Sequence, residues 1–337
     1  MTPVRLLALA ALTLPLPLIL AHAQEATAQE GRGTQVGQTP AYTFRSEGVN
    51  QGGLKSLAEL RGKPVLVDFW GVKCPPCVGF AVPKGVEMQR EYGDDLQVVF
   101  VESQGHDLPT VQRLAYNSKW MGSNAVWTSE RPFDVGLDGI PHFALLDVDG
   151  KIILQGYTME LHSQLEELVA QQVAIAQKGP KGLDKGLAKA WKARAKGEFA
   201  KAVEVAQEAG NKGAEGAEAF IASVHTMADL RLRRIEWMVE HGQANAAAAA
   251  IAELAKAVGD LEGVSTRVAD LATRLASPEM KDELEAAKQL EKLEATLAED
   301  GLDGRGLDKK LERIAEKFSA THAGARARDL AALIAAG

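Results

Sequence analysis

The chain has 337 residues, 46% of them hydrophobic and 25% charged, and its formal net charge is −7. This is the composition of an ordinary globular protein with room for two domains. The acidic balance and the lack of any basic block exclude a nucleic-acid-binding protein of the usual kind.

The N-terminus has the pattern of a secretory signal peptide. Arg5 supplies the positive charge, an apolar run covers 6–20, and Ala21-His22-Ala23 forms a small-x-small cleavage signal. The alternative is a membrane anchor, but the run is about 15 residues, shorter than the roughly 20 of a spanning helix, and Pro15 and Pro17 interrupt it. We therefore expect a signal peptide over 1–23, cleavage after Ala23, and export.

Residues 24–39 are polar, contain glycine and lack periodicity, so we expect a flexible linker there. A domain should then begin at Pro40. We expect a short edge strand over 41–44 and a helical turn over 56–60 before the first buried strand.

The apolar segment 65–70, Val-Leu-Val-Asp-Phe-Trp, predicts that buried strand. It is followed by Cys74-Pro75-Pro76-Cys77, which holds the only two cysteines of the protein and begins a predicted helix. Prolines suit a first helical turn. The N–H groups and the positive dipole end there favour a thiolate, so Cys74 should be nucleophilic near neutral pH.

The cysteine pair has two other interpretations. Half a zinc site would need a further Cys or His pair at suitable spacing, and the chain has no other cysteine. A static disulfide that closes so small a loop would stabilise the fold little. The strand that leads into the motif favours redox chemistry.

Asp68 interrupts the apolar strand on the same face as Leu66 and Trp70. Burial there should raise the pKa of its carboxyl group toward neutrality, where it could exchange protons. The alternative is a solvated aspartate on an edge strand.

The next segments alternate between helix and strand and end in a hairpin around Asp149-Gly150, which predicts a mixed sheet with helices on both faces. Pro83 should break or kink the first helix. The predicted helices are 77–92, 108–120 and 161–176, and the predicted strands are 96–102, 125–128, 143–147 and 151–155.

A boundary at Gly179-Pro180-Lys181-Gly182 starts an Ala-, Glu-, Lys- and Leu-rich region that should be all helical over 179–337. Residues 190–202 resemble part of a tetratricopeptide-type hairpin, with a fainter echo at 242–257, but two imperfect copies do not establish a repeat array. The other predicted helices are 214–240, 261–276, 279–299 and 307–318.

Residues 38–175 resemble the thioredoxin fold, and within it the extracytoplasmic TlpA/ResA-type thiol–disulfide oxidoreductases. The resemblance rests on the segment 57–70, on Cys-Pro-Pro-Cys, and on Gly139-Ile140-Pro141-His142 before the hairpin. One departure is Lys73, which stands where that family usually has Trp. Lys73 should add to the stabilisation of a Cys74 thiolate, or it is an ordinary loop lysine.

The resemblance implies an α/β thioredoxin-like domain over 40–178, followed by the all-α domain over 179–337. It implies that Cys74 attacks and Cys77 resolves, assisted by Asp68. Pro141 would be a cis-proline, with Ile140 offering its backbone to the substrate and Trp70 packing beside the site. We expect His142 to be structural.

The predicted function is that of an exported thiol–disulfide oxidoreductase of the periplasm or cell envelope, more specifically a reductase of exported protein disulfides. It would need no cofactor or metal. Its partners would be protein thiols and disulfides, a membrane electron-donor protein, and a protein bound by the helical domain. The alternative is a cell-envelope scaffold whose helices recruit a partner and whose thioredoxin domain is weakly active.

Overall fold

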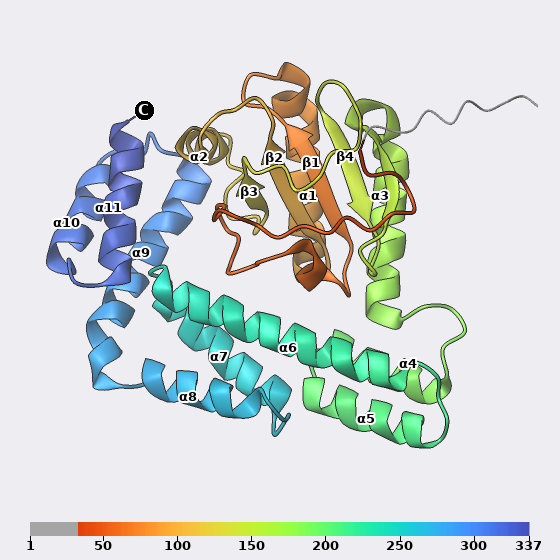
Figure 1. The fold of residues 1–337 in the computed structure, drawn as a ribbon. Coiled ribbons are helices and arrows are strands. Elements are labelled where there is room, and N and C mark those ends of the chain that lie inside the picture. The colour runs from red at the N-terminus through yellow and green to blue at the C-terminus, as the bar shows by residue number, and fades with distance from the viewer. Residues whose placement is uncertain (1–32, 337) are drawn as a thin grey trace, which may run out of the picture. The chain divides into compact units, whose positions relative to one another are not determined.

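A five-stranded mixed sheet organises the first half of the computed structural model, which describes residues 33–336 (Figure 1). The strand order is β3-β2-β1-β4-β5; β1, β2 and β3 run parallel, whereas β4 and β5 are antiparallel to their neighbours. The strands are β1 Val65–Trp70, β2 Gln97–Glu102, β3 Val126–Thr128, β4 His142–Leu146 and β5 Ile152–Tyr157. With a cysteine pair after β1 and a proline before β4, this is a thioredoxin-like fold, which confirms the predicted fold class.

The helices of this part follow the predicted alternation. They are the 3₁₀ helix η1 Leu57–Leu60, the π turn η2 Cys77–Ala81, α1 Val82–Tyr92, the 3₁₀ helix η3 Gly93–Asp95, α2 Leu108–Asn117 and α3 Thr158–Lys178. The expected break at Pro83 takes the form of the π turn directly before it. Because proline lacks an N–H and its ring crowds the preceding turn, a locally widened helix accommodates it. The expected edge strand over 41–44 is reduced to one bridge between Thr43 and Ser56.

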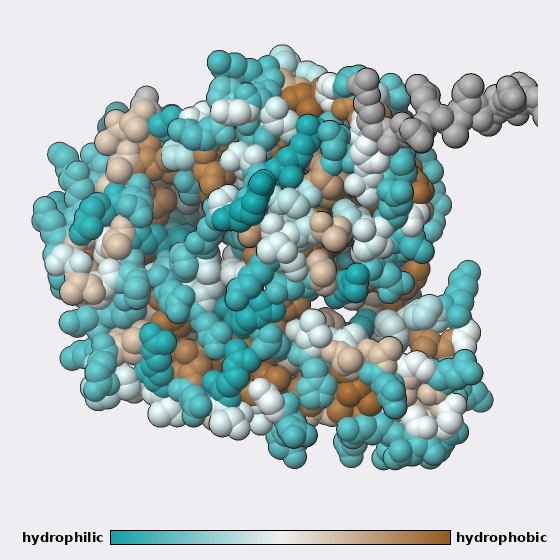
Figure 2. Space-filling view, in the orientation of Figure 1, coloured by the Kyte–Doolittle hydropathy of each residue, from teal (hydrophilic) through white to brown (hydrophobic). Residues whose placement is uncertain are grey.

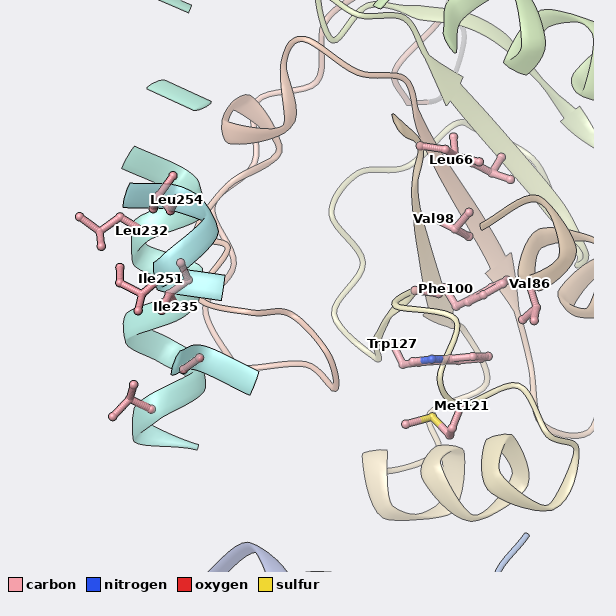
Figure 3. Packing of buried hydrophobic residues seen from close by; sticks show 14 of the residues in the cluster. Leu66, Val86, Val98, Phe100, Met121, Trp127, Leu232, Ile235, Ile251 and Leu254 are labelled. Atoms are coloured by element: carbon pink, nitrogen blue, oxygen red, sulfur yellow. The ribbon is translucent and has the colours of Figure 1, made fainter. Parts of the chain in front are cut away.

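Strand β1 is buried on both faces. Leu66 and Trp70 lie in one hydrophobic cluster with residues of α1 and α3, among them Val86 and Leu165. Figure 3 shows Leu66, Val98 and Phe100 along the sheet, with Val86 of α1 beside them. The opposite face, which includes Val67, is covered by η1 and by loop residues before β4.

Residues beyond α3 are helical, as predicted, and lie along the lower and left parts of Figure 1. Neighbours along the chain pack against one another from α4 to α8, α10 packs on α11, and α9 contacts α7, α10 and α11. The helices are α4 Lys185–Ala195, α5 Phe199–Asn211, α6 Ala217–Glu240, α7 Ala244–Val258, α8 Ser265–Leu275, α9 Lys281–Asp300, α10 Leu307–Lys317 and α11 His322–Ala335, with a 3₁₀ turn at Pro278–Met280.

Helix α11 is not among the helices predicted from the sequence. Its buried face includes Ala323, Ala327 and Ala331, whose small side chains give a weak hydrophobic pattern. Thr321 caps the helix, because its side-chain oxygen accepts a hydrogen bond from the Gly324 N–H. No helix within 33–336 is both long and apolar enough to cross a bilayer.

The helical region contacts the sheet domain through α6. Arg233 forms an ion pair with Glu59 at 2.7 Å, and the indole N–H of Trp237 donates a hydrogen bond to Glu47. Since Glu59 lies in η1 and Glu47 in the loop before it, these contacts hold α6 against the segment that leads into β1.

Two further contacts lie at the ends of the helical region. At its start, Arg194 of α4 donates a hydrogen bond to the carbonyl oxygen of Ala176 at 2.8 Å. Near its end, the side-chain oxygen of Asn117 in α2 accepts a 3.0 Å hydrogen bond from the N–H of Leu302, just beyond α9. Residues 33–336 accordingly belong to one compact unit.

The predicted signal peptide and residues 24–32 of the predicted linker lie outside the described residues. The remaining part of that linker, 33–39, is hydrogen-bonded to the sheet domain. The Thr34 N–H donates to the carbonyl oxygen of Asp134 at 2.6 Å, and the Gly37 N–H donates to that of Ile152 at 2.8 Å. This part of the segment therefore packs on the sheet.

Candidate active site

The two cysteines lie just beyond the carboxyl end of β1 and form a disulfide with a Cα–Cα distance of 5.2 Å. A tight turn joins them to the strand, with the Cys74 N–H donating to the carbonyl oxygen of Gly71 at 3.1 Å. Cys74 retains 6% of its surface exposed and Cys77 none. The exposed prolines between them leave Cys74 the more accessible sulfur.

The helix that follows stabilises negative charge on Cys74. Helical backbone begins at Pro75, and the N–H of Cys77 donates to the sulfur of Cys74 at 3.2 Å. When the disulfide is reduced, this donor and the positive end of the helix favour the thiolate over the thiol. Local sequence produces this arrangement, because both prolines occupy positions where no backbone N–H is needed.

The loop before β4 closes the other side of Cys74. The Ile140–Pro141 peptide bond is cis, as predicted. The carbonyl oxygen of Ile140 lies 3.7 Å from the sulfur of Cys74. The N–H of Thr158, at the start of α3, donates a hydrogen bond to the carbonyl oxygen of Pro141 at 3.3 Å. Pro141 is buried and Ile140 half-buried, so the fold brings these two residues against the disulfide.

Asp68 lies inside the protein below the cysteine pair, at the middle of β1. Its residue is 2% exposed, and its Oδ1 has no hydrogen-bond partner among residues 33–336. Burial raises the pKa of the Asp68 carboxyl from 3.8 to about 7. A group with that pKa takes up and releases a proton near neutral pH.

Trp70 is in the core and has no exposed surface. Its ring meets those of Trp120 and Trp127 edge-on, with centroids 6.1 and 5.7 Å apart. Because the Trp70 side chain is fully buried, it cannot touch a substrate directly. Trp70 instead packs beneath the turn that carries Cys74.

Lys73 has an exposed side chain, but its backbone is held by residues that the sequence analysis did not identify. The Lys73 N–H donates to the side-chain oxygen of Gln104 at 2.8 Å. The N–H of Gln104 in turn donates to the carboxylate of Glu102 at 3.0 Å. Glu102 is buried at the end of β2. The one sequence signal that could have identified Glu102 is that it is a charged residue at the end of an apolar strand.

His142 has a structural environment, as expected. It is buried, its ring stacks on Phe69 at 4.6 Å, and its Nδ1 lies 2.7 Å from the carbonyl oxygen of Gly139. Burial lowers the pKa of the imidazole, which favours its neutral form. His142 thus anchors the loop that carries Ile140.

Within residues 33–336, no three His, Cys, Asp or Glu side chains are grouped so that they could hold a metal ion. The site brings together a disulfide, a backbone carbonyl and a buried carboxyl group whose pKa lies near neutrality.

No known protein-family profile matches the chain. A thioredoxin-like protein, YneN of Bacillus subtilis, is 35% identical over 78 residues, which are 23% of this chain and 41% of that protein. The chain thus spans less than half the length of this relative.

Two solved structures are similar to part of the chain. A thioredoxin-like superfamily protein, SPOA0173, has a TM-score of 0.35 and 16% identity, covering 40% of this chain and 96% of that one. A putative thiol:disulfide interchange protein DsbE from Chlorobium tepidum has a TM-score of 0.32 and 20% identity, covering 42% and 98%. The fold assignment rests on the strand order and on the positions of the two motifs.

Proposed function

We propose that this protein catalyses thiol–disulfide exchange on other proteins through Cys74 and Cys77. The observation that carries the proposal is the position of the Cys74 sulfur. It lies between the N–H of Cys77, 3.2 Å away, and the carbonyl oxygen of Ile140, 3.7 Å away. The N–H of Cys77 stabilises a thiolate on Cys74. The backbone at Ile140 can form hydrogen bonds with an extended substrate chain.

In the reducing direction, the Cys74 thiolate attacks one sulfur of a substrate disulfide and displaces the other as a thiolate. The product is a mixed disulfide between Cys74 and the substrate. The Cys77 thiolate then attacks the sulfur of Cys74 and displaces the second substrate thiolate. The substrate gains two electrons, and the Cys74–Cys77 disulfide forms.

Asp68 supports the second step as a proton acceptor. Cys77 is fully buried, so its thiol loses a proton to water less readily than an exposed thiol. Asp68 lies on the face of β1 whose other residues, Leu66 and Trp70, share a cluster with both cysteines. With a pKa of about 7 its carboxyl accepts that proton near neutral pH.

We propose further that the substrates are exported proteins and that the direction is reductive. Export rests on the N-terminal pattern with its Ala21-His22-Ala23 cleavage signal. The reductive direction rests on the resemblance to extracytoplasmic oxidoreductases. A membrane protein would have to supply electrons, since each turnover leaves the cysteines oxidised.

The helical region is proposed to bind a protein partner. The α4–α5 hairpin, with Gly197 at its turn, has the form of one tetratricopeptide-type unit. If recruitment were the whole function, the cysteine site would have little activity.

Reduction of insulin disulfides with dithiothreitol as electron source tests the activity. The wild-type protein should accelerate it, and Cys74→Ser should not. A wild-type rate equal to that of Cys74→Ser would instead favour the recruitment role. The direction is tested by the reduction potential of the Cys74–Cys77 pair, for which we expect about −270 mV; a potential of about −120 mV would make the protein an oxidant.

A further inference from the structure

A cavity of about 810 Å³ lies between the sheet domain and the helical region, apart from the cysteine site. Its walls include the loops at 50–54 and 59–63 on one side and helices α6 and α7 on the other. Figure 2 shows hydrophilic surface and hollows along this border on the face in view. The cavity is within the range of about 300 to 1,000 Å³ that is usual for small-molecule sites.

One wall of the cavity is basic. Arg231 and Arg234 stand three residues apart on one side of α6, and Lys63 faces them from the turn before β1. Burial lowers the pKa of Lys63 to about 8; the Asp94 carboxylate opposes that shift, and the guanidinium groups of Arg234 and Arg231 add to it. Both guanidinium groups therefore lie near the Lys63 ammonium group, along the same cavity wall.

No described carboxylate forms an ion pair with Arg231 or Arg234. Arg231 lies over the ring of Phe199 at 4.8 Å, and Lys63 donates a hydrogen bond only to the backbone oxygen of Asp94. Of the acidic side chains in the cavity wall, Asp94 acts on Lys63. The others are engaged elsewhere: Glu59 with Arg233, Glu253 with Lys256, Glu291 with Asn245, Glu294 with Arg326 and Asp95 with Gln177. Arg231 is exposed and Arg234 is half-buried. A half-buried guanidinium without a counter-charge is costly unless an anion joins it.

The wall beside the cations is apolar. Met227, Ile235 and Met238 lie on the same helix as the arginines, and Leu254 projects from α7. Figure 3 shows Ile235 and Leu254 on these two neighbouring helices. A ligand that reached the three cations would place any further atoms against these side chains.

We propose that the cavity binds a small organic anion, with a carboxylate or phosphate held by Lys63, Arg231 and Arg234 and an apolar body along α6 and α7. Guanidinium groups suit both oxyanions because their planar donors match two acceptor oxygens at once. Since the site draws on both the sheet domain and the helices, a bound ligand stabilises the contact between them.

Calorimetry on the oxidised chain, without its predicted signal peptide, tests the proposal. The probes are octyl phosphate, octanoate, octyltrimethylammonium and inorganic phosphate, each below its micelle concentration. We expect one or both octyl anions to bind, and to bind at least tenfold more tightly than the octyl cation or inorganic phosphate. The two octyl anions distinguish a phosphate from a carboxylate ligand.

The variant Arg231→Gln/Arg234→Gln should weaken binding of the preferred anion at least tenfold, whereas Lys189→Gln, at an exposed position of α4 outside the cavity, should leave it unchanged. If the double variant fails to fold by circular dichroism, Lys63→Met serves in its place. Equal binding of the octyl cation, unchanged affinity in the variant, or no binding of either octyl anion would overturn the proposal. Insulin reduction is measured in parallel, and its outcome is independent, because no cavity residue belongs to the cysteine site.

Discussion

Asp68 places a carboxyl group within the hydrophobic core of the sheet, and this has a cost that depends on pH. The folded protein holds a proton on Asp68 up to about pH 7, whereas an unfolded chain releases it near 3.8. Between these values the folded state binds more protons than the unfolded state. The free energy of unfolding should therefore fall as the pH rises from about 4 to about 7, and then level off.

Asp68→Asn should remove this pH dependence, since asparagine keeps the volume but does not titrate. The interval between the two pKa values corresponds to a difference on the order of 4 kcal/mol. Urea unfolding of the oxidised protein and of the variant at pH 4.5, 6 and 7.5 measures it. We expect the variant to gain stability relative to the wild type as the pH rises; parallel curves would mean that Asp68 is solvated in the folded protein.

At the residue scale, the sequence predicted the features that depend on local pattern. Cys74, Cys77 and the cis bond at Pro141 follow from motifs, and the burial of Asp68 follows from alternation along one strand. The roles of Glu102 and Gln104 could not be predicted from local pattern, because they depend on β2 lying beside β1. Trp70 was expected near the substrate, but a residue that points into a sheet's covered face is enclosed by side chains from distant segments, here Trp120 and Trp127.

Among the elements, the turn between α6 and α7 shows how a glycine fixes helix packing. Gly242 has φ +75°, and a Cβ at this position would lie 2.7 Å from the Cα of Ala323 in α11. Gly213, between α5 and α6, has φ +88° and no atom within 4 Å of such a Cβ. The two glycines share the backbone requirement, but only Gly242 also allows close approach of another helix.

Gly242→Ala should therefore destabilise the protein more than Gly213→Ala. Both substitutions force alanine into a left-handed conformation, at a cost of about 1–2 kcal/mol. Gly242→Ala adds an overpacked contact with a helix backbone, typically about 1–3 kcal/mol. Thermal unfolding of the two variants measures the difference. Equal losses would show that α11 does not pack against this turn.

At this scale the prediction succeeded where breakers and periodicity are clear, as in the strands and in most helices. The missed α11 and the reduced edge strand near Thr43 have different causes. Alanine-rich faces carry little hydrophobic signal, and an edge strand forms only if a partner strand lies beside it.

For the molecule as a whole, the sheet domain and the helical region share one buried hydrophobic cluster. They are joined also by polar contacts such as Arg233 with Glu59 and Leu302 with Asn117. The proposed boundary near Gly179 implies that a fragment of residues 33–178 folds by itself and keeps its thiol activity, since all the proposed site residues lie within it. It should melt below the full chain, because each lost contact contributes about 1 kcal/mol.

Circular dichroism of this fragment tests whether it folds, its melting temperature tests the loss of stability, and insulin reduction tests its thiol activity. A fragment that is insoluble or unfolded, beside a stable full chain, would mean that the helices complete the core of the sheet domain. The composition change at residue 179 would then not mark a domain boundary.

The assignment of Cys74 as the attacking thiol is the central claim, and covalent trapping tests it most directly. Reduced Cys77→Ser and Cys74→Ser are each mixed with a disulfide-bonded peptide at pH 7, and adducts are followed by intact mass. Cys77→Ser should rapidly accumulate a mixed disulfide that dithiothreitol removes, because Cys74 is the more exposed of the two cysteines and its thiolate is stabilised. Cys74→Ser should accumulate little, because Cys77 is buried. Equal or faster trapping by Cys74→Ser, or no adduct with Cys77→Ser, would contradict the account.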